Sequence, residues 1–270
     1  MPQITSADNP RFRALLKLHQ SSRERRKAGL SLLDGVHLVA AHLEHMGAPQ
    51  DIVVSRSHLT DHEIASLLQC AEMPEPIVLS DALFRLLSSV ATPTGVIAVV
   101  KTPRESALPA IPETCVMLED VQDPGNVGSV LRSAAAAGVE EVYLSRTCVQ
   151  AWSPRVLRAA MGAHFVLRIH EGVDLATFAR TYPGKVLAVA GDGAIPFYSA
   201  DLTARTALLF GNEGAGLSRA LRDAAHDTIS IPMPGKAESL NVAAAAAVCL
   251  FERVRQRAAE RERSGVCGQP

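Results

Sequence analysis

Short apolar runs alternate with amphipathic segments along most of the chain, and this pattern predicts an α/β protein. A stretch rich in Pro and polar residues, 102–113, separates two such regions and indicates a linker between two domains. We therefore expect a small α/β domain at 1–101, a second domain at 114–262 and a disordered tail at 263–270. In the first domain, the pattern predicts strands at 30–35, 51–55, 76–80 and 95–100, with helices at 36–46, 61–71 and 81–88.

The second region continues the alternation with longer apolar runs. It predicts strands at 115–121, 141–145, 165–169, 185–190, 206–211 and 228–233, with helices at 127–137, 154–161 and 175–181 and after each of the last two strands. Apolar runs separated by helices are typical of a mainly parallel sheet covered on both faces. In such sheets, ligands bind beyond the carboxyl ends of the strands.

Composition narrows the class of protein without identifying a partner. The 270 residues are 47% hydrophobic and 20% charged with a formal net charge of -1, so a nucleic-acid site would have to be a local patch. The five cysteines are scattered, which favours reduced thiols in the cytoplasm over a disulfide framework or a metal site. The start lacks a signal-peptide pattern, and the longest apolar run, 242–251, is too short to cross a bilayer, so we expect no membrane partner.

Three loops rich in Gly or Pro each follow a predicted strand. They read DVQDPGNVGSVLR (120–132), FGNEGAGLS (210–218) and IPMPGKAESLN (231–241). If the sheet is parallel, all three open onto the same edge, and their glycines allow the backbone to approach a ligand closely.

The first loop offers Asn126 as an N-cap and Gly138 as the stop of the helix that follows. Arg132 stands six residues into that helix, roughly 9 Å along its axis, and its side chain leans back toward the N-terminus. A lone Arg on a helix that continues as AAAAG suggests a function. The alternative is a simple cap and a solvated cation.

The other two loops bear polar residues among their glycines. GNEGAG does not match the G-x-G-x-x-G dinucleotide pattern, which disfavours an oxidoreductase, and Glu213 within it is equally compatible with a solvated turn. Ser239 or Asn241 could cap the helix that begins with the run Ala243–Ala247. That run lets another element pack closely, inside the domain or at a subunit contact.

Taken in order, DPGNVGSVLRSAAAAG, LLFGNEGAGLS and IPMPGKAESLNVAAAAAVCLFE resemble the three motifs of the TrmH (SpoU) branch of the SPOUT methyltransferases, over residues 116–252. The first domain resembles, more loosely, the L30e-like substrate-binding domain of that family at LLDGVHLVAAHLE and TPTGVIAVV. The resemblance implies transfer of a methyl group from S-adenosylmethionine to a ribose 2′-hydroxyl. It also implies a C-terminal trefoil knot, an exception to the rule that chains do not thread loops, and a homodimer.

The resemblance also assigns roles to individual residues. Arg132 would lie next to the hydroxyl as a fixed cation that holds the 3′ phosphate, and Glu213 and Asn241 would orient both Arg132 and the loops. Ser239 would contact the ribose or the cofactor carboxylate, and Asn126 would complete the polar group. Since a guanidinium stays protonated in proteins, water or the substrate phosphate would accept the proton. The cofactor would contact Gly211, Ile231, Leu240, Met233, Ala190 and Gly191.

RNA would be the partner, with 23S-type rRNA favoured. The alternatives are a tRNA 2′-O-methyltransferase and a non-catalytic RNA-binding relative, while the TrmH-type form of the three motifs disfavours methylation of a base. Residues 1–30 carry seven basic residues against two acidic ones, and we expect RNA contacts from Arg11, Arg13, Arg25 and Arg26. An ordinary solvated helix is the alternative. Trp152 and Ser153 lie in a loop where relatives contact substrate, although core packing explains them equally well.

Overall fold

The computed structural model describes residues 3–70, 72–103 and 112–263. These residues form two compact units, each described here by itself. The first contains the residues up to 103 together with 150–165, and the second contains 112–149 and 166–263. The segment 150–165, which lies between two strands of the second unit along the chain, thus packs with the first unit.

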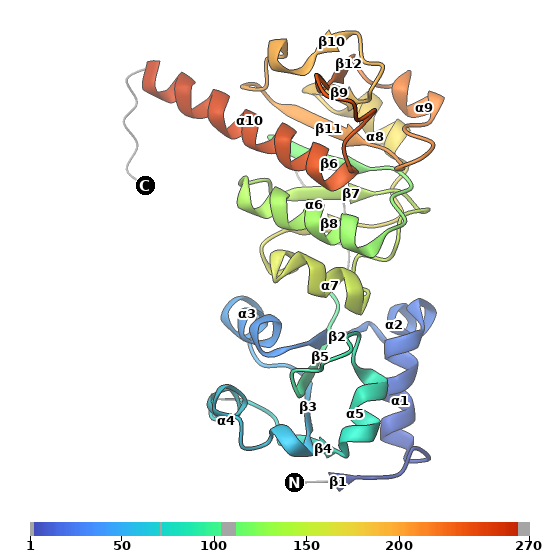
Figure 1. Cartoon of the computed structure of the whole chain (residues 1–270), viewed down its shortest axis with the longest axis vertical. Coiled ribbons are helices and arrows are strands. Elements are labelled where there is room, and N and C mark those ends of the chain that lie inside the picture. The colour runs from blue at the N-terminus through green and yellow to red at the C-terminus, as the bar shows by residue number, and fades with distance from the viewer. Residues whose placement is uncertain (1–2, 71, 104–111, 264–270) are drawn as a thin grey trace. The chain divides into compact units, whose positions relative to one another are not determined.

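The first unit is built on a five-stranded mixed sheet in the order β1-β4-β3-β5-β2 (Figure 1). Its strands are β1 (Gln3–Ile4), β2 (Leu30–Asp34), β3 (Asp51–Ser55), β4 (Ile77–Leu79) and β5 (Val96–Lys101). β5 runs antiparallel to both β2 and β3, while β1, β4 and β3 are parallel. Each of the four strands predicted for this region is confirmed.

Helices flank this sheet because their apolar stripes match its faces. They are α1 (Pro10–Gln20), α2 (Ser22–Ala28), α3 (Val36–Met46), α4 (His62–Leu68), α5 (Asp81–Leu87) and α7 (Pro154–Ala160), with short 3-10 turns at Arg56–His58 and Ala163–Phe165. Phe12, Leu15 and Leu18 of α1 are buried against strand residues such as Val53 and Val99. The core of the first unit therefore forms between α1, α5 and the sheet.

The second unit contains a seven-stranded sheet, parallel throughout, in the order β10-β12-β9-β11-β6-β7-β8. The strands are β6 (Thr114–Leu118), β7 (Glu141–Leu144), β8 (Arg168–His170), β9 (Lys185–Val189), β10 (Ile195–Pro196), β11 (Thr206–Phe210) and β12 (Asp227–Ser230). β6 and β11 are buried at every position, which explains why they read as continuous apolar runs. The predicted parallel sheet is confirmed.

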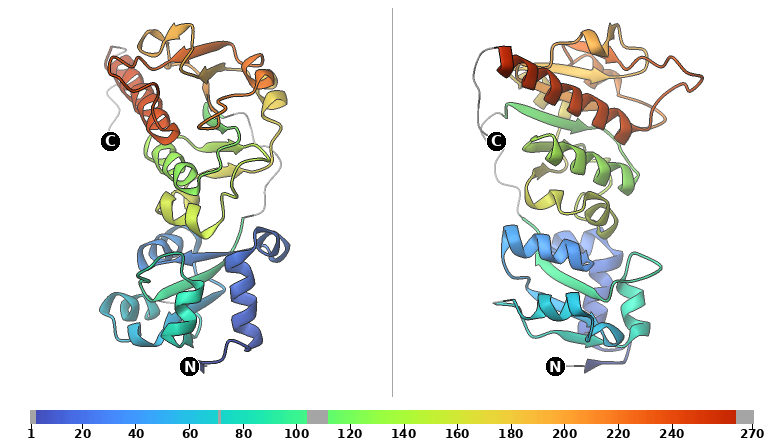
Figure 2. Two further views of the ribbon diagram at one scale, coloured as in Figure 1. Left: turned by 45° about the vertical axis from the view of Figure 1, so that its right-hand side comes forward. Right: turned by 60° about the vertical axis from the view of Figure 1, so that its left-hand side comes forward.

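Helices cover both faces of this sheet. α8 (Leu175–Thr181) and α9 (Arg219–Arg222) pack on the face that presents Cys115, Met117 and Leu209. α6 (Pro124–Ala136) and α10 (Val242–Arg263) lie side by side on the opposite face, as the views of Figures 1 and 2 agree. The small side chains of 243–247 permit this close packing of α10 on α6.

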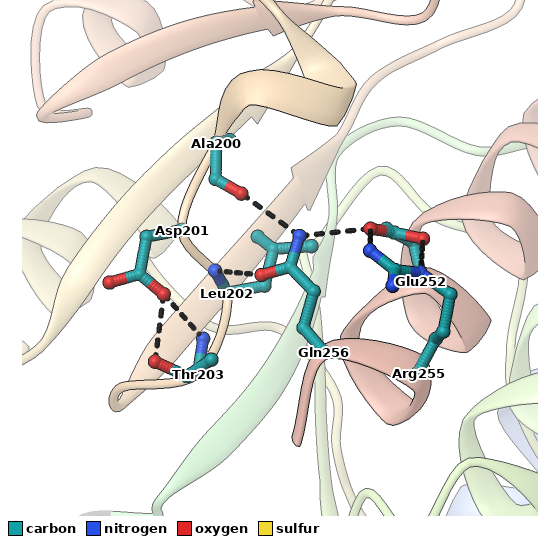
Figure 3. A network of polar contacts seen from close by, with 7 residues as sticks. All are labelled: Ala200, Asp201, Leu202, Thr203, Glu252, Arg255 and Gln256. Atoms are coloured by element: carbon teal, nitrogen blue, oxygen red, sulfur yellow. Dashed lines mark hydrogen bonds and ion pairs between the residues drawn. The ribbon is translucent and has the colours of Figure 1, made fainter. Parts of the chain in front are cut away.

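Gln256 attaches the second half of α10 to a neighbouring loop (Figure 3). The Gln256 amide accepts a hydrogen bond from Leu202 N (2.9 Å) and donates to Ala200 O (3.1 Å) and to Glu252 Oε1 (2.9 Å). These bonds attach the helix to the loop that precedes β11. The loop is itself closed by Asp201, which accepts from the Thr203 backbone and hydroxyl.

Several boundaries differ from the prediction. The helix predicted at 61–71 ends at Leu68, and the strand predicted at 165–169 begins at Arg168 because residues 163–165 form a 3-10 turn. β1 and β10 are too short to give a sequence pattern, and both are edge strands. Most of the expected linker and nearly all of the expected tail lie outside the described residues. No helix within the described ranges has the length and hydropathy needed to span a membrane.

Candidate active site

The three glycine-bearing loops meet at the carboxyl ends of β6, β11 and β12, as predicted. The side chain of Asn126 joins them. Its Nδ2 donates a hydrogen bond to Glu213 Oε1 at 2.6 Å, and its Oδ1 accepts one from Asn241 Nδ2 at 2.9 Å. These residues come from α6, the loop after β11 and the loop that leads into α10. A single side chain therefore connects segments 87 and 115 residues away along the chain.

Two further contacts fasten the first loop to the second. The Ser218 backbone N–H and hydroxyl both donate to the Glu119 carboxylate, at 2.6 and 2.7 Å. The Asn212 amide donates to the Asp120 carbonyl at 2.8 Å. Sequence reasoning missed these residues, although two acids placed directly after a buried strand could have indicated them.

Asn126 is not the N-cap of α6, and that prediction was wrong. Asp123 caps the helix, because its Oδ1 accepts from Asn126 N at 2.8 Å and Pro124 occupies the first turn, where a missing N–H carries no penalty. The Asn126 side chain is thus left free to bridge the loops. Gly138, at φ 73°, follows the helix as predicted, and Asn241 caps α10 by accepting from Ala243 N and Ala244 N.

Arg132 lies on α6, six residues after Asn126, with its side chain exposed. Among the residues that the structure describes, it has no hydrogen bond or ion pair. Glu213 and Asn241 contact Asn126 and not Arg132, so the contacts do not support their expected role of orienting the guanidinium. The positive charge of Arg132 remains available to a ligand.

A cavity of about 480 Å³ opens beside these loops, within the size range of small-molecule sites. All six residues expected to contact the cofactor line it, namely Ala190, Gly191, Gly211, Ile231, Met233 and Leu240. Glu213 and Ser239 also line it, so the cavity adjoins the polar group around Asn126. Sequence reasoning missed the lining residue Arg222, whereas Glu238 belongs to the polar loop 231–241 that the sequence singled out.

Two glycines shape the cavity in different ways. A Cβ at Gly211 would lie 2.4 Å from the Gly216 carbonyl carbon, so the close approach of the two ends of this loop requires glycine. A Cβ at Gly191 would meet no atom within 4 Å. Because Gly191 lines the cavity, its missing side chain leaves room for a ligand.

Arg222, which lines the cavity, forms an ion pair with Asp192. Arg222 Nη1 lies 2.9 Å from Asp192 Oδ2 and 3.1 Å from Oδ1. The hydrogen bond from Arg222 lowers the pKa of the Asp192 carboxyl, and the same contact raises the pKa of Arg222. The loop after β9 is thereby attached to α9.

The candidate RNA contacts fall into three environments. Arg11 pairs with Asp51 and Arg13 with Asp8, both at the surface. Arg25 is only 5% exposed and donates to Gln150 Oε1 and to the Leu18 and His19 carbonyl oxygens, so its burial is not compatible with a phosphate contact. Arg26 is exposed.

The Trp152 loop takes the packing role. Trp152 is 6% exposed and contacts the His164 ring edge to face, and Ser153 caps α7. Phe12 is buried as well. Within the described residues, no group of three or more His, Cys, Asp or Glu side chains could hold a metal ion.

Comparisons with known proteins give two family matches. Residues 113–251 match the model of the SpoU rRNA Methylase family, and residues 9–98 match the MRM3-like substrate binding domain. The chain is 32% identical to the 23S rRNA (guanosine(2553)-2′-O)-methyltransferase RlmP of Bacillus subtilis, over 93% of this chain and 98% of that protein. It is also 32% identical to the 23S rRNA (uridine(2479)-2′-O)-methyltransferase of Streptomyces viridochromogenes, over 94% and 92% of the two chains.

Among solved structures, the SpoU methyltransferase AviRb from Streptomyces viridochromogenes, in complex with the cofactor AdoMet, superimposes with a TM-score of 0.83. The two are 30% identical, and the alignment covers 93% of this chain and 98% of that one.

Proposed function

Because this chain belongs to the SpoU rRNA methylase family, we propose that it transfers a methyl group from S-adenosylmethionine to a ribose 2′-hydroxyl of 23S-type rRNA. The observation that carries the proposal is the bridge from Asn126 to Glu213 and Asn241, which gathers three loops beside the cavity. The two relatives named above carry this activity in their names, and the solved neighbour holds this cofactor.

The residues around the cavity fit the proposed cofactor. Ile231, Met233 and Leu240 offer an apolar wall for a flat ring, and the open position at Gly191 leaves space for a bulky ligand. The carboxylates of Glu213 and Glu238 line the same cavity and suit a ligand that carries positive charge. When bound, S-adenosylmethionine supplies a sulfonium methyl that is open to attack by an oxygen.

The chain's contribution to the reaction is to position the hydroxyl and to favour the charge that develops on it. The exposed and unpaired Arg132 holds the phosphate next to the target ribose and stabilises the oxygen as it loses its proton to water. Asn126 keeps Glu213 and Asn241 in place, and through them the loops that line the cavity. Ser239, exposed at the cavity, contacts the ribose or the cofactor carboxylate.

Four finer features belong to the same proposal. We propose that β11, β12 and the loops after them form a trefoil knot; the sheet order, with β11 between β9 and β6 and β12 outside β9, supports this. We also propose a homodimer, since α10 exposes the apolar side chains of Phe251 and Val254. A cytoplasmic location is proposed because each cysteine in the described ranges is a free thiol. We also propose functional domains at 1–101 and 114–262, and the family matches at 9–98 and 113–251 support this division.

The test is methyl transfer to in vitro transcribed 23S rRNA from S-adenosylmethionine that carries a labelled methyl group. After digestion to nucleosides, the label should stay on the ribose. A label on a base, or no transfer with a chain that binds S-adenosylhomocysteine, would contradict the proposal. Arg132→Ala should abolish transfer while S-adenosylhomocysteine binding, measured by calorimetry, is retained, because Arg132 does not line the cavity. Arg180→Ala on α8, which removes another exposed arginine, should keep both properties.

A further inference from the structure

The helices α2 and α7 of the first unit carry a basic surface, of which only Arg26 is among the RNA contacts predicted from the sequence. We call it the α2–α7 patch and define it as Arg23, Arg26, Lys27, Arg155 and Arg158. Four of these side chains are exposed, and Arg158 is partly exposed. The two helices are more than a hundred residues apart in sequence, so the sequence alone could not have indicated a common surface.

A buried hydrogen bond holds the two parts of the patch together. Arg25 of α2 donates from Nε and Nη2 to Gln150 Oε1, at 2.9 and 2.6 Å, and Gln150 begins the segment that leads into α7. α7 then packs on β2, the strand that follows α2. Both helices belong to the same compact unit.

Arg155 follows Gln150 by five residues, and its charge acts on His19, as does the charge of Arg25. Burial lowers the pKa of His19, and the positive charges of Arg25 and Arg155 lower it further against the opposing charge of Asp34. His19 lies next to α2 in the chain, and its carbonyl accepts from Arg25 Nη1 at 3.2 Å. Arg155 therefore extends the positive charge of α2.

The patch carries an excess of positive charge that the protein itself does not neutralise. Within the part of the chain that the structure describes, none of the five side chains forms an ion pair. Residues 150–165 contain no Asp or Glu, and α2 contains only Glu24. The arginines of α1 differ, because Arg11 and Arg13 are each paired with an aspartate.

We propose that the α2–α7 patch binds the sugar-phosphate backbone of the RNA substrate. Guanidinium and ammonium groups without acidic partners suit phosphate oxygens, and the aromatic side chains of Trp152 and Phe12 are buried, so they do not stack on bases. The contact therefore holds RNA by its backbone and leaves base recognition to other parts of the complex. This inference rests on the proposed function, because it takes RNA as the substrate.

Two double variants with the same change in net charge test the inference. Arg26→Gln with Arg155→Gln removes two unpaired cations of the patch, and Arg11→Gln with Arg13→Gln removes two paired cations of α1 in the same unit. The dissociation constant for a fluorescent 23S rRNA transcript is measured from 50 to 300 mM KCl. Each lost phosphate contact reduces the salt slope by about 0.7 to 1, so the patch variant should bind about 20-fold more weakly at 0.1 M salt.

The α1 variant should keep nearly the wild-type slope. Equal weakening in both variants would show that only overall charge matters and would overturn the inference, as would an unchanged slope in the patch variant. Tighter binding of the wild-type chain to phosphatidylglycerol vesicles than to the transcript would also overturn it. Thermal unfolding of both variants confirms that they are folded. Methyl transfer by the wild-type chain is measured separately, so that a failure of the patch proposal can be distinguished from a failure of the proposed function.

Discussion

The bridge at Asn126 makes Asn126→Ala the most informative substitution in this chain. It removes the donor to Glu213 Oε1 at 2.6 Å and the acceptor for Asn241 Nδ2 at 2.9 Å, and it leaves the N-cap of α6 intact because Asp123 supplies the cap. A hydrogen bond contributes about 0.5 to 1.5 kcal/mol to stability, and more to a charged partner. Since these side chains are reached by water, we expect a loss of about 1 kcal/mol in the free energy of unfolding, or about 2 to 4 °C in Tm.

The effect on methyl transfer should be much larger than the effect on stability. Without the bridge, the loops that carry Glu213 and Asn241 lose their common anchor, and a small misplacement of reacting groups lowers turnover about a hundredfold. Such a loss corresponds to about 2.7 kcal/mol in the activation free energy. The assay is single-turnover methyl transfer to the 23S rRNA transcript at saturating cofactor, with thermal unfolding measured on the same samples.

Gln256→Ala is the matched control, since it also truncates a bridging amide in the second unit and removes three hydrogen bonds (Figure 3). It should destabilise the fold to a similar degree and leave turnover near wild type. Asn126→Asp adds a second test, because it replaces the donor by a carboxylate that faces Glu213 and should impair transfer at least as much. If Asn126→Ala and Gln256→Ala lower turnover equally, the bridge has no special part in the reaction.

Three further predictions concern the cavity, a buried arginine and a buried histidine. Gly191→Leu should abolish S-adenosylhomocysteine binding in calorimetry with little change in Tm, whereas Gly211→Ala should lower Tm, because its Cβ would lie 2.4 Å from backbone. Arg25→Gln should lower the free energy of unfolding by about 1 to 3 kcal/mol, since buried hydrogen-bond acceptors lose their donor, without changing the salt slope of RNA binding. Burial lowers the pKa of His164 from 6.5 to about 4, so the unfolded chain binds a proton in this range that the folded chain does not. Stability should therefore be complete above about pH 6.5 and fall by about 3 kcal/mol as the pH decreases toward 4, as measured by urea unfolding.

Each of these has an outcome that would contradict it. Normal cofactor binding by Gly191→Leu would place the ligand elsewhere, and an unchanged Tm for Gly211→Ala would show that the loop can relax. A lower salt slope for Arg25→Gln would mean that this residue contacts RNA after all. His164→Gln should show a smaller loss of stability at acidic pH than wild type, and an equal loss in both would assign the effect to other groups.

Much of the fold could be predicted from the sequence because burial on both faces leaves a strong local signal. Continuous apolar runs such as 206–210 are central parallel strands, and the order of the three glycine-bearing loops indicated that they share one edge. These two features follow from periodicity and from the backbone freedom of glycine, which are local properties of a sequence. The six expected cofactor contacts came instead from the resemblance to the TrmH (SpoU) family, and all six are among the residues that line the cavity.

Other features depend on contacts between distant segments and have no local signal. The sequence suggested Asn126 as a cap, but in the tertiary structure Asp123 takes that position and Asn126 bonds to Glu213 and Asn241. The charge of Arg25 suggested an RNA contact, and only packing against Gln150 shows that it is buried. A polar side chain can bind a ligand, cap a helix or pack in the core. Which of these it does depends on the partners within hydrogen-bonding distance, about 3 Å, and the tertiary structure decides which groups come that close.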